Sequence, residues 1–265
     1  MESGQVAPLL SLFGGVDELA AERLGVVSIR HWSAVRKLSK SPPASFEGSA
    51  FVAELFSRVS TNWDRCLAVL DRQPSRENWR WFDPKCEMSA HNPSKEVTLE
   101  RAIVGAAEAQ GRKDWSNQVP IGSGLIARGG DRRRAVDLVH RREPDAFDLV
   151  ELKVESDNPL YAAIEILRYG FAWLLSRQHQ AALGYSDRTL IQASDVRLSV
   201  LAPYQYYRDL SLGWLSDGLA EGLQSLGDRH GVRLTFAFES FPESFVWPGT
   251  DPALALSALD NRLRR

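Results

Sequence analysis

The chain has 265 residues, of which 44% are hydrophobic and 25% charged, and its formal net charge is −2. These values are typical of a globular protein and exclude a disordered, collagen-like or disulfide-framework chain. Because the net charge is close to zero, any binding of nucleic acid must depend on a local basic patch. Cys66 and Cys86 form no CxxC motif and the N-terminus lacks a signal-peptide pattern, which together predict a reduced, cytoplasmic chain without membrane contact.

The first third of the chain is predicted to be mainly helical. Apolar residues recur at helical spacing, and helices are expected at residues 16–24, 29–38 and 51–70, with a turn at 41–45. An aromatic, turn-rich stretch at 78–93 follows. This change in composition predicts an N-terminal helical region over residues 1–91 and a second domain over residues 92–265.

The second domain has alternating helical and strand patterns. Asn92 followed by Pro93 predicts the start of a helix that ends near residue 110. Apolar runs bounded by glycine, proline and aspartate predict strands at 118–127, 134–140, 147–154, 197–202 and 232–238, with helices at 159–178 and 213–226. The order α-β-β-β-α-β-α-β indicates an α/β fold with a mixed sheet and flanking helices.

Charged side chains interrupt two of the predicted strands. Successive side chains of a strand alternate between its faces, so Glu151 and Lys153 share one face of the strand at 147–154. Asp137 is a lone carboxylate in the preceding strand, and it would converge with Glu151 if the two strands pair. A buried carboxylate is costly unless it is paired or binds a metal, and two carboxylates suit Mg²⁺. With a lysine beside them to orient water, these groups indicate a metal-dependent phosphodiesterase.

Asp137 followed by Glu151-Leu152-Lys153 resembles the D…(D/E)xK signature of the PD-(D/E)XK nuclease superfamily. The order of predicted elements over about residues 92–241 resembles that fold as well. The resemblance implies an Mg²⁺-dependent nuclease or endonuclease, with Mn²⁺ as a possible substitute, that hydrolyses phosphodiester bonds, with DNA favoured over RNA as substrate. It implies that Asp137 and Glu151 bind the metal and that Lys153 positions the attacking water.

Three further residues extend the resemblance. The family commonly adds a glutamate from the first helix, and Glu100 takes that place among apolar neighbours at helical spacing, with Glu96 as the competing candidate. Glu165 and Tyr169 are similar to the QxxxY element of the RecB-type exonuclease-like branch, although glutamate replaces the glutamine. The resemblance therefore implies that Glu100 completes the metal cluster and that Glu165 and Tyr169 support the site. The alternative for the last two is the polar edge of an amphipathic helix.

A local basic patch flanks the strand that carries Asp137. It consists of Arg132, Arg133, Arg134, Arg141 and Arg142. These arginines could hold phosphates on both sides of a cleft, and the alternative is a solvated rim of a hairpin.

Two other functions compete with the nuclease hypothesis. One is a catalytically inactive nuclease-fold module that binds nucleic acid or a protein partner. The other is a structural α/β protein in which Glu151 and Lys153 form a solvated ion pair, and Asp137 and Glu151 would then lie on opposite sheet faces. Residues 1–91 could contact DNA or a partner protein, including a homodimer or larger complex, and their sequence does not distinguish between these roles.

Overall fold

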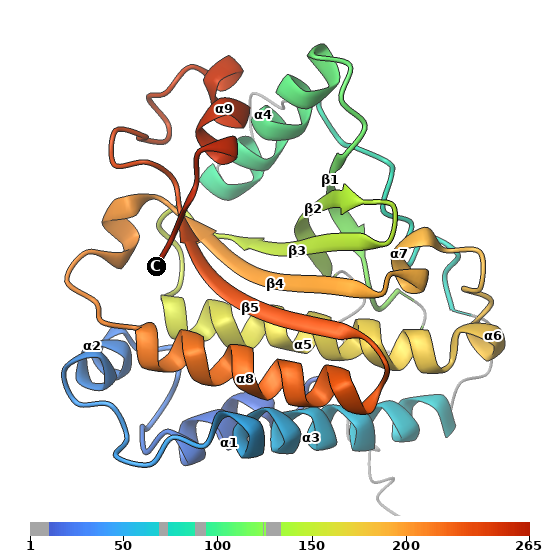
Figure 1. Cartoon of the computed structure of the whole chain (residues 1–265), viewed down its shortest axis with the longest axis vertical. Helices are drawn as coiled ribbons and strands as arrows, with labels where there is room; N and C mark the ends of the chain where they lie inside the picture. The colour runs from blue at the N-terminus through green and yellow to red at the C-terminus, as the bar shows by residue number, and fades with distance from the viewer. Residues whose placement is uncertain (1–10, 69–73, 88–93, 124, 126–133) are drawn as a thin grey trace, which may run out of the picture.

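A six-stranded mixed sheet forms the centre of the protein, with the strand order β1-β2-β3-β4-β5-β6 (Figure 1). The computed structural model describes residues 11–68, 74–87, 94–123, 125 and 134–265. The strands are β1 (Trp115–Pro120), β2 (Ala135–Glu143), β3 (Ala146–Leu152), β4 (Asp195–Ala202), β5 (Arg233–Ser240) and β6 (Leu263–Arg264). Neighbours from β1 to β3 are antiparallel, β3 to β5 are parallel, and β6 is antiparallel to β5. The predicted α/β class with a mixed sheet is confirmed.

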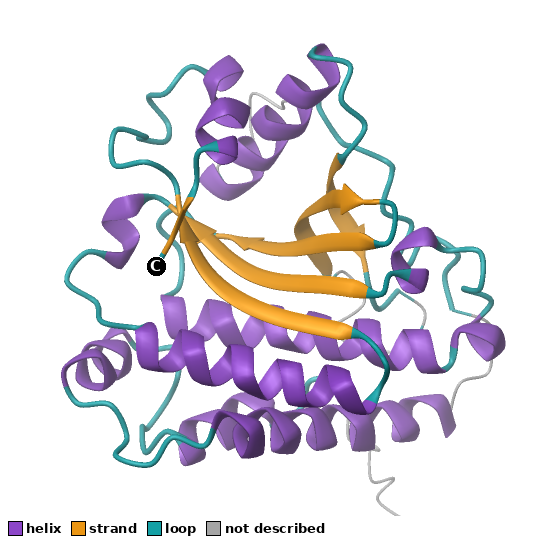
Figure 2. Ribbon diagram, in the orientation of Figure 1, coloured by secondary structure: helices purple, strands orange, loops and turns teal. Residues whose placement is uncertain are grey.

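Helices cover both faces of this sheet (Figure 2). On one face lie α5 (Pro159–Gln178) and α8 (Gly213–Arg229), and on the other lie α4 (Lys95–Ala109) and α9 (Ala255–Asp260). The N-terminal helices are α1 (Val16–Arg23), α2 (Trp32–Lys40) and α3 (Gly48–Ala68), and α3 packs along α8 and α5 as an outer layer. Short helical segments complete the described chain: α6 (Gln180–Leu183), α7 (Thr189–Gln192), η2 (Tyr204–Tyr207) and η3 (Pro252–Leu254).

Two apolar cores lie on the two faces of the sheet. The larger core contains the apolar residues of α1, α3, α5 and α8, and the smaller one contains those of α4 and α9. Strand β3 contributes to both cores, because Phe147 and Leu149 pack in the larger and Val150 and Leu152 in the smaller. Glu151 has the parity of Leu149, so it lies on the face that α5 covers.

Several predicted boundaries need correction. The first strand was expected at 118–127, but β1 runs from Trp115 to Pro120, because its pairing with β2 begins at Trp115 opposite His140. Ser94 caps α4 by accepting a hydrogen bond from the Val97 N–H group, whereas the predicted start at Asn92 lies outside the described residues. Helix α9 and strand β6 were not predicted, since such short elements depend on contacts with the rest of the fold.

The N-terminal helices share the larger core with the sheet. Val52 and Leu55 of α3 belong to the same apolar cluster as Leu219 of α8 and Leu198 of β4. The predicted division between residues 91 and 92 lies outside the described residues. Within the described parts of the chain, no helix combines the length and the apolar character that crossing a membrane requires.

Candidate active site

Three polar side chains lie in one row across three neighbouring strands. Asn117 and Val119 pair with Leu138 and Val136, which brings Gln118 level with Asp137. Leu138 pairs with Val150, so Asp137 and Glu151 are the next residues along the two strands. Residues directly opposite in an antiparallel pair share a face, with Cβ atoms about 4.5–5.5 Å apart. Asp137 is held in place by the Leu152 N–H group, which donates to Asp137 Oδ2 at 2.9 Å. A position of Asp137 and Glu151 on opposite faces would have favoured the purely structural alternative, whereas both side chains line the same cleft.

The row opens into a cleft of ≈ 380 Å³ between β3, α4 and α5. Of the described residues that line this cleft, six carry carboxylates and two carry a positive charge. The acidic residues are Glu96, Glu100, Asp137, Glu151, Asp157 and Glu165, and the basic ones are Arg30 and Lys153. The excess of carboxylates makes the cleft attractive to a cation.

Lys153 is the cation at the centre of this acidic group. Its Nζ atom lies 2.8 Å from Glu151 Oε1, 3.2 Å from Glu165 Oε2 and 3.4 Å from Asp157 Oδ2. Burial opposes the charge of Lys153, but the neighbouring carboxylates Glu151 and Glu165 outweigh it and raise the pKa of Lys153. Lys153 therefore stays charged and fixes the carboxylates around it.

Glu165 and Tyr169 reach the cleft from α5, one helical turn apart. Glu165 Oε1 accepts a hydrogen bond from Tyr169 Oη at 3.2 Å and one from Arg134 Nη1 at 2.9 Å. Burial tends to raise the pKa of Glu165, but Lys153 and the other donors lower it on balance. Glu165 is thus an ionised residue held by two cations, and the predicted pair of α5 residues does face the cleft.

Glu100 projects into the cleft from α4 and is only 1% exposed. Its Oε2 atom accepts a hydrogen bond from Gln118 Nε2 at 2.6 Å. Gln118 has a backbone φ of 51°, in the left-handed region that a non-glycine residue seldom adopts and that costs about 1–3 kcal/mol. This unusual backbone lies in the strand row opposite Asp137, where the polar side chains meet.

The carboxyl groups repel one another in the folded protein. Burial, and next the charge of Asp137, raise the pKa of Glu100 to about 9. Burial likewise raises the pKa of Asp137 to about 6 against the opposing effect of Lys153. For Glu151, burial and the charges of Asp137 and Glu165 raise the pKa well above its ordinary value. Near neutral pH this group of carboxylates therefore needs protons or a bound cation to offset its charge.

One carboxylate oxygen of the site, Oε2 of Glu151, is available as a metal ligand. Oε2 of Glu151 is buried, and no hydrogen-bond donor among the described residues reaches it. The charge of Asp137 disfavours the ionisation of Glu151 and so raises its pKa, and a proton or a cation bound at these two carboxyl groups would relieve that repulsion. Mg²⁺ is usually held by one or two carboxylates, with water and substrate phosphate completing its shell, so these two residues fit it. Among the described residues, no group of three or more His, Cys, Asp or Glu side chains arranged to hold a metal is found.

Glu96, the competing candidate on α4, has a different role from Glu100. Its Oε1 atom accepts hydrogen bonds from the backbone N–H groups of residues 154–156 at 3.2–3.4 Å, and from Ser156 Oγ at 2.7 Å. Burial opposes ionisation, but these donors lower the pKa of Glu96 to about 2. Glu96 thus binds the loop after Lys153 to α4 and stabilises that edge of the cleft.

The predicted arginine patch is only partly gathered at the cleft. Arg134 contacts Glu165, as described above, whereas Arg142 pairs with Asp148 at 2.6 Å and with Asp195 at 2.9 Å. Arg141 lies over the ring of Trp81, with 5.8 Å between its Cζ atom and the ring centroid. The remaining two members of the patch, Arg132 and Arg133, lie outside the described residues.

Asp148 lies on the opposite face of β3, as its parity predicts. It is fully buried and contacts Arg142, Arg197 and Arg262 at 2.6–3.2 Å. Although burial opposes ionisation, His140 and these arginines lower the pKa of Asp148 to about 2. This network ties the C-terminal segment to the sheet and belongs to the fold rather than to the cleft.

The residues of the cleft that were not among the predicted site residues include Gln118, Asp157 and Arg30. The polar and glycine residues that follow Asn117 in the sequence are a weak signal for Gln118, because such residues let a phosphate come close to the backbone. No pattern in the sequence indicates that Arg30, more than one hundred residues before Asp137, lies at the same cleft. Only the packing of the N-terminal helices brings it there.

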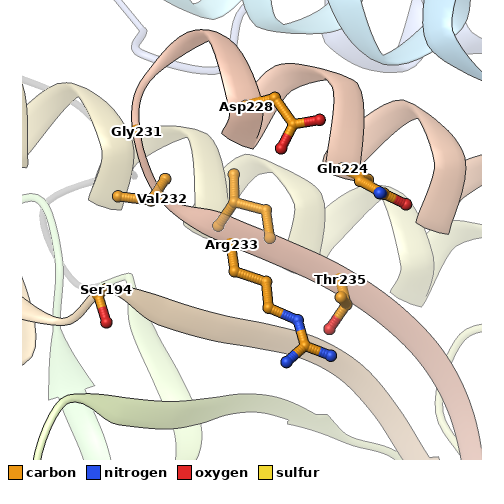
Figure 3. A pocket seen from close by; sticks show the side chains of 8 residues that line it. Ser194, Gln224, Asp228, Gly231, Val232, Arg233 and Thr235 are labelled. Carbon is orange, nitrogen blue, oxygen red and sulfur yellow. The ribbon is translucent and has the colours of Figure 1, made fainter.

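Another hollow, of ≈ 540 Å³, lies at the far end of the parallel strands, between the end of α8 and the start of β5 (Figure 3). Its charged lining residues are Asp228 and Arg233, and Arg233 already pairs with Asp195 at 3.4 Å. This hollow has one carboxylate where the cleft has six, and it lies at the amino ends of β4 and β5. In open α/β sheets ligands bind at the carboxyl ends of the strands, which favours the cleft as the functional site.

Comparison with protein-family models, with curated proteins and with solved structures finds no match for this chain.

Proposed function

We propose that this protein is a metal-dependent nuclease of the PD-(D/E)XK type that hydrolyses phosphodiester bonds of nucleic acid, with DNA favoured over RNA. The observation that carries the proposal is that Asp137 and Glu151, on the neighbouring strands β2 and β3, line one cleft, with Lys153 Nζ 2.8 Å from Glu151. The acidic cleft that these three groups line supports it.

In this proposal Asp137 and Glu151 hold Mg²⁺, or Mn²⁺ in its place. The carboxylate of the half-buried Asp137 and Oε2 of Glu151, which has no hydrogen-bond partner among the described residues, provide the oxygen ligands. The ion would polarise the phosphodiester and stabilise the charge that develops on it during hydrolysis. Glu100 adds to the acidic cluster, either directly or through water.

Lys153 has the positioning role. Its ammonium group is held most closely by Glu151 and Glu165, and its longest contact, 3.4 Å to Asp157, is the one that an attacking water would replace. Tyr169 and Arg134 position Lys153 indirectly, because both donate hydrogen bonds to Glu165, which in turn contacts Lys153.

A second candidate is a nuclease-fold module that binds nucleic acid or a protein without cleaving. One observation favours it: Lys153 contacts three carboxylates, and this would leave it little freedom to assist a reaction. The two candidates differ in one measurable property, namely metal-dependent cleavage.

The test is a cleavage assay on linear duplex, closed circular and single-stranded DNA, and on RNA, with Mg²⁺, Mn²⁺ or EDTA. We expect cleavage by the wild type with either metal and none in EDTA. Asp137→Asn and Lys153→Met should each lower the rate at least about 100-fold, because they remove a metal ligand and a water-positioning cation. Circular DNA also separates endonuclease from exonuclease action.

Matched controls are Asp217→Asn on the exposed side of α8 and Lys113→Met in the exposed loop before β1, both outside the cleft. These should cleave like the wild type. If the wild type leaves every substrate intact with both metals, the enzyme proposal fails. If Asp137→Asn cleaves at the wild-type rate, the assigned site is wrong.

A further inference from the structure

The outer wall of the cleft comes from the N-terminal region, through Arg30. This residue follows α1 and lines the cleft together with Tyr161 of α5. Its guanidinium carbon lies 4.0 Å from the centroid of the Tyr161 ring, and half of its side chain is exposed. Arg30 is therefore a solvent-accessible cation on a wall of an acidic cleft.

Arg30 is held in place by two independent contacts. Its Nε and Nη2 atoms donate to Asp17 Oδ2 at 3.2 and 2.8 Å. The preceding residue, Ile29, is fully buried, and its carbonyl accepts a hydrogen bond from Asn158 Nδ2 at 3.0 Å. Because Asn158 is also the N-cap of α5, the backbone at Arg30 is fixed relative to the helix that carries Glu165.

The charge of Arg30 is only partly offset. Asp17 pairs with Arg168 as well as with Arg30, and Arg168 is almost fully buried. One carboxylate thus serves two guanidinium groups, so these three side chains together carry one net positive charge, and Arg30 is the solvent-accessible cation of the three. Nη1 of Arg30 makes no hydrogen bond within the described parts of the chain, so it can donate to a ligand.

The contacts also order the groups along the cleft. Asp137 and Glu151 come first, Lys153 bridges Glu151 to Glu165, and Tyr161 lies one helical turn before Glu165 on the same face of α5. Arg30 covers the ring of Tyr161 and so lines the same cleft at that side chain.

We propose that Arg30 binds a second phosphate of the nucleic-acid backbone, next to the phosphate that lies at Asp137 and Glu151. Guanidinium groups bind phosphate through paired hydrogen bonds, and a stacked, anchored arginine loses little freedom on binding. The N-terminal region is then part of the substrate cleft. This inference rests on the proposed function, which supplies nucleic acid as the ligand and Asp137 and Glu151 as the site of the first phosphate.

The test measures binding of a fluorescein-labelled single-stranded DNA oligonucleotide by fluorescence anisotropy, with Ca²⁺ in place of Mg²⁺, over a series of salt concentrations. Arg30→Gln should weaken binding about tenfold and reduce the slope of log K against log salt by about 0.7, the contribution of one phosphate contact on a single strand. Arg30→Lys keeps the charge and should keep the slope. A merely structural role of Arg30 would not change the slope.

The matched control is Arg36→Gln, which removes an exposed arginine of α2 that lies outside the cleft and should bind like the wild type. Asp17 keeps its pairing with Arg168 in Arg30→Gln, so the variant should fold, which its melting curve checks.

If the wild type binds and Arg30→Gln has the same affinity and slope, the inference is overturned while the proposed function stands. If Arg30→Gln binds weakly but the wild type shows no metal-dependent cleavage, the phosphate contact stands and the enzymatic proposal fails. If the wild type binds no DNA at any salt concentration, both are overturned.

Discussion

Glu100 illustrates how burial alters a single side chain of the site. In the unfolded chain it ionises at the ordinary pKa of glutamate, whereas in the folded protein burial and Asp137 raise the pKa to about 9. The folded state then binds one proton more than the unfolded state between these two pKa values. The contribution of Glu100 to stability is therefore present at low pH and is lost as the pH rises towards about 9.

Replacing Glu100 by glutamine should remove this dependence. The new amide would keep the shape of the side chain, and its oxygen can still accept the hydrogen bond from Gln118. In EDTA at about pH 8, we expect Glu100→Gln to raise the free energy of unfolding by on the order of 1–3 kcal/mol, since one pKa unit corresponds to about 1.4 kcal/mol. At about pH 4.5 the variant and the wild type should be nearly equal. Urea denaturation at both pH values measures the difference.

Glu221→Gln, on the exposed side of α8, is the matched control and should leave the stability unchanged at both pH values. A loss of stability in Glu100→Gln at the higher pH would contradict the assigned environment of Glu100.

Helix α5 is the element on which the site depends most. Its N-cap Asn158 accepts hydrogen bonds from the backbone N–H groups of Leu160 and Tyr161 at 3.0 and 3.1 Å. Its side-chain nitrogen donates to the Ile29 carbonyl at 3.0 Å. One side chain thus starts the helix that carries Glu165 and joins it to the N-terminal region.

The two roles of Asn158 can be separated by substitution. Asn158→Ala should lower the free energy of unfolding by about 2–4 kcal/mol, because the helix loses its cap and the buried Ile29 carbonyl loses its donor. Asn158→Ser keeps a capping oxygen but is too short to reach Ile29, so its loss should be smaller, about 1–2 kcal/mol. Urea denaturation of both variants measures this order. Asp251→Ala, which removes an exposed cap of the short η3 segment, should cost less than either, and an equal loss in all three would contradict the dual role.

At the scale of the whole molecule, α3 and α8 meet at backbone distance. A Cβ atom at Gly222 would overlap the carbonyl oxygen of Gly48 and lie 2.6 Å from Val52 Cγ2. The N-terminal helices and the α/β part therefore share a tightly packed interface inside the larger core. Such an interface favours unfolding of both parts in one transition.

Gly222→Ala should lower the free energy of unfolding by about 1–3 kcal/mol, because the added methyl group forces α3 away from α8. Gly213→Ala, at the first residue of the same helix, adds a methyl group with no atom within 4 Å and should be neutral or slightly stabilising. Tryptophan fluorescence and circular dichroism should give coincident thermal transitions in all three proteins. Two separate transitions in the wild type would show instead that residues 11–68 unfold on their own.

The sequence predicted the position of site residues best where charged or polar side chains follow the periodicity of a single strand or helix. The alternation around Glu151 and Lys153 predicted the face that each side chain occupies, and the helical spacing of Glu165 and Tyr169 predicted their common face on α5. Both follow from the geometry of one strand or one helix, which neighbouring residues determine. The pairing of Asp137 with Glu151 required only one hairpin, and it too was predicted.

Contacts between distant segments were decided only in the tertiary structure. Arg30 reaches the cleft because α1 and α3 pack against α5, and Gln118 meets Glu100 because β1 adopts a left-handed backbone at that residue. The choice between Glu96 and Glu100 likewise depended on the position of the loop at residues 154–156. Such contacts join residues far apart in the chain, and their geometry depends on the packing of the whole core rather than on any local pattern. For this protein the sequence alone therefore determined which groups could act together, and the packing determined which further groups surround them.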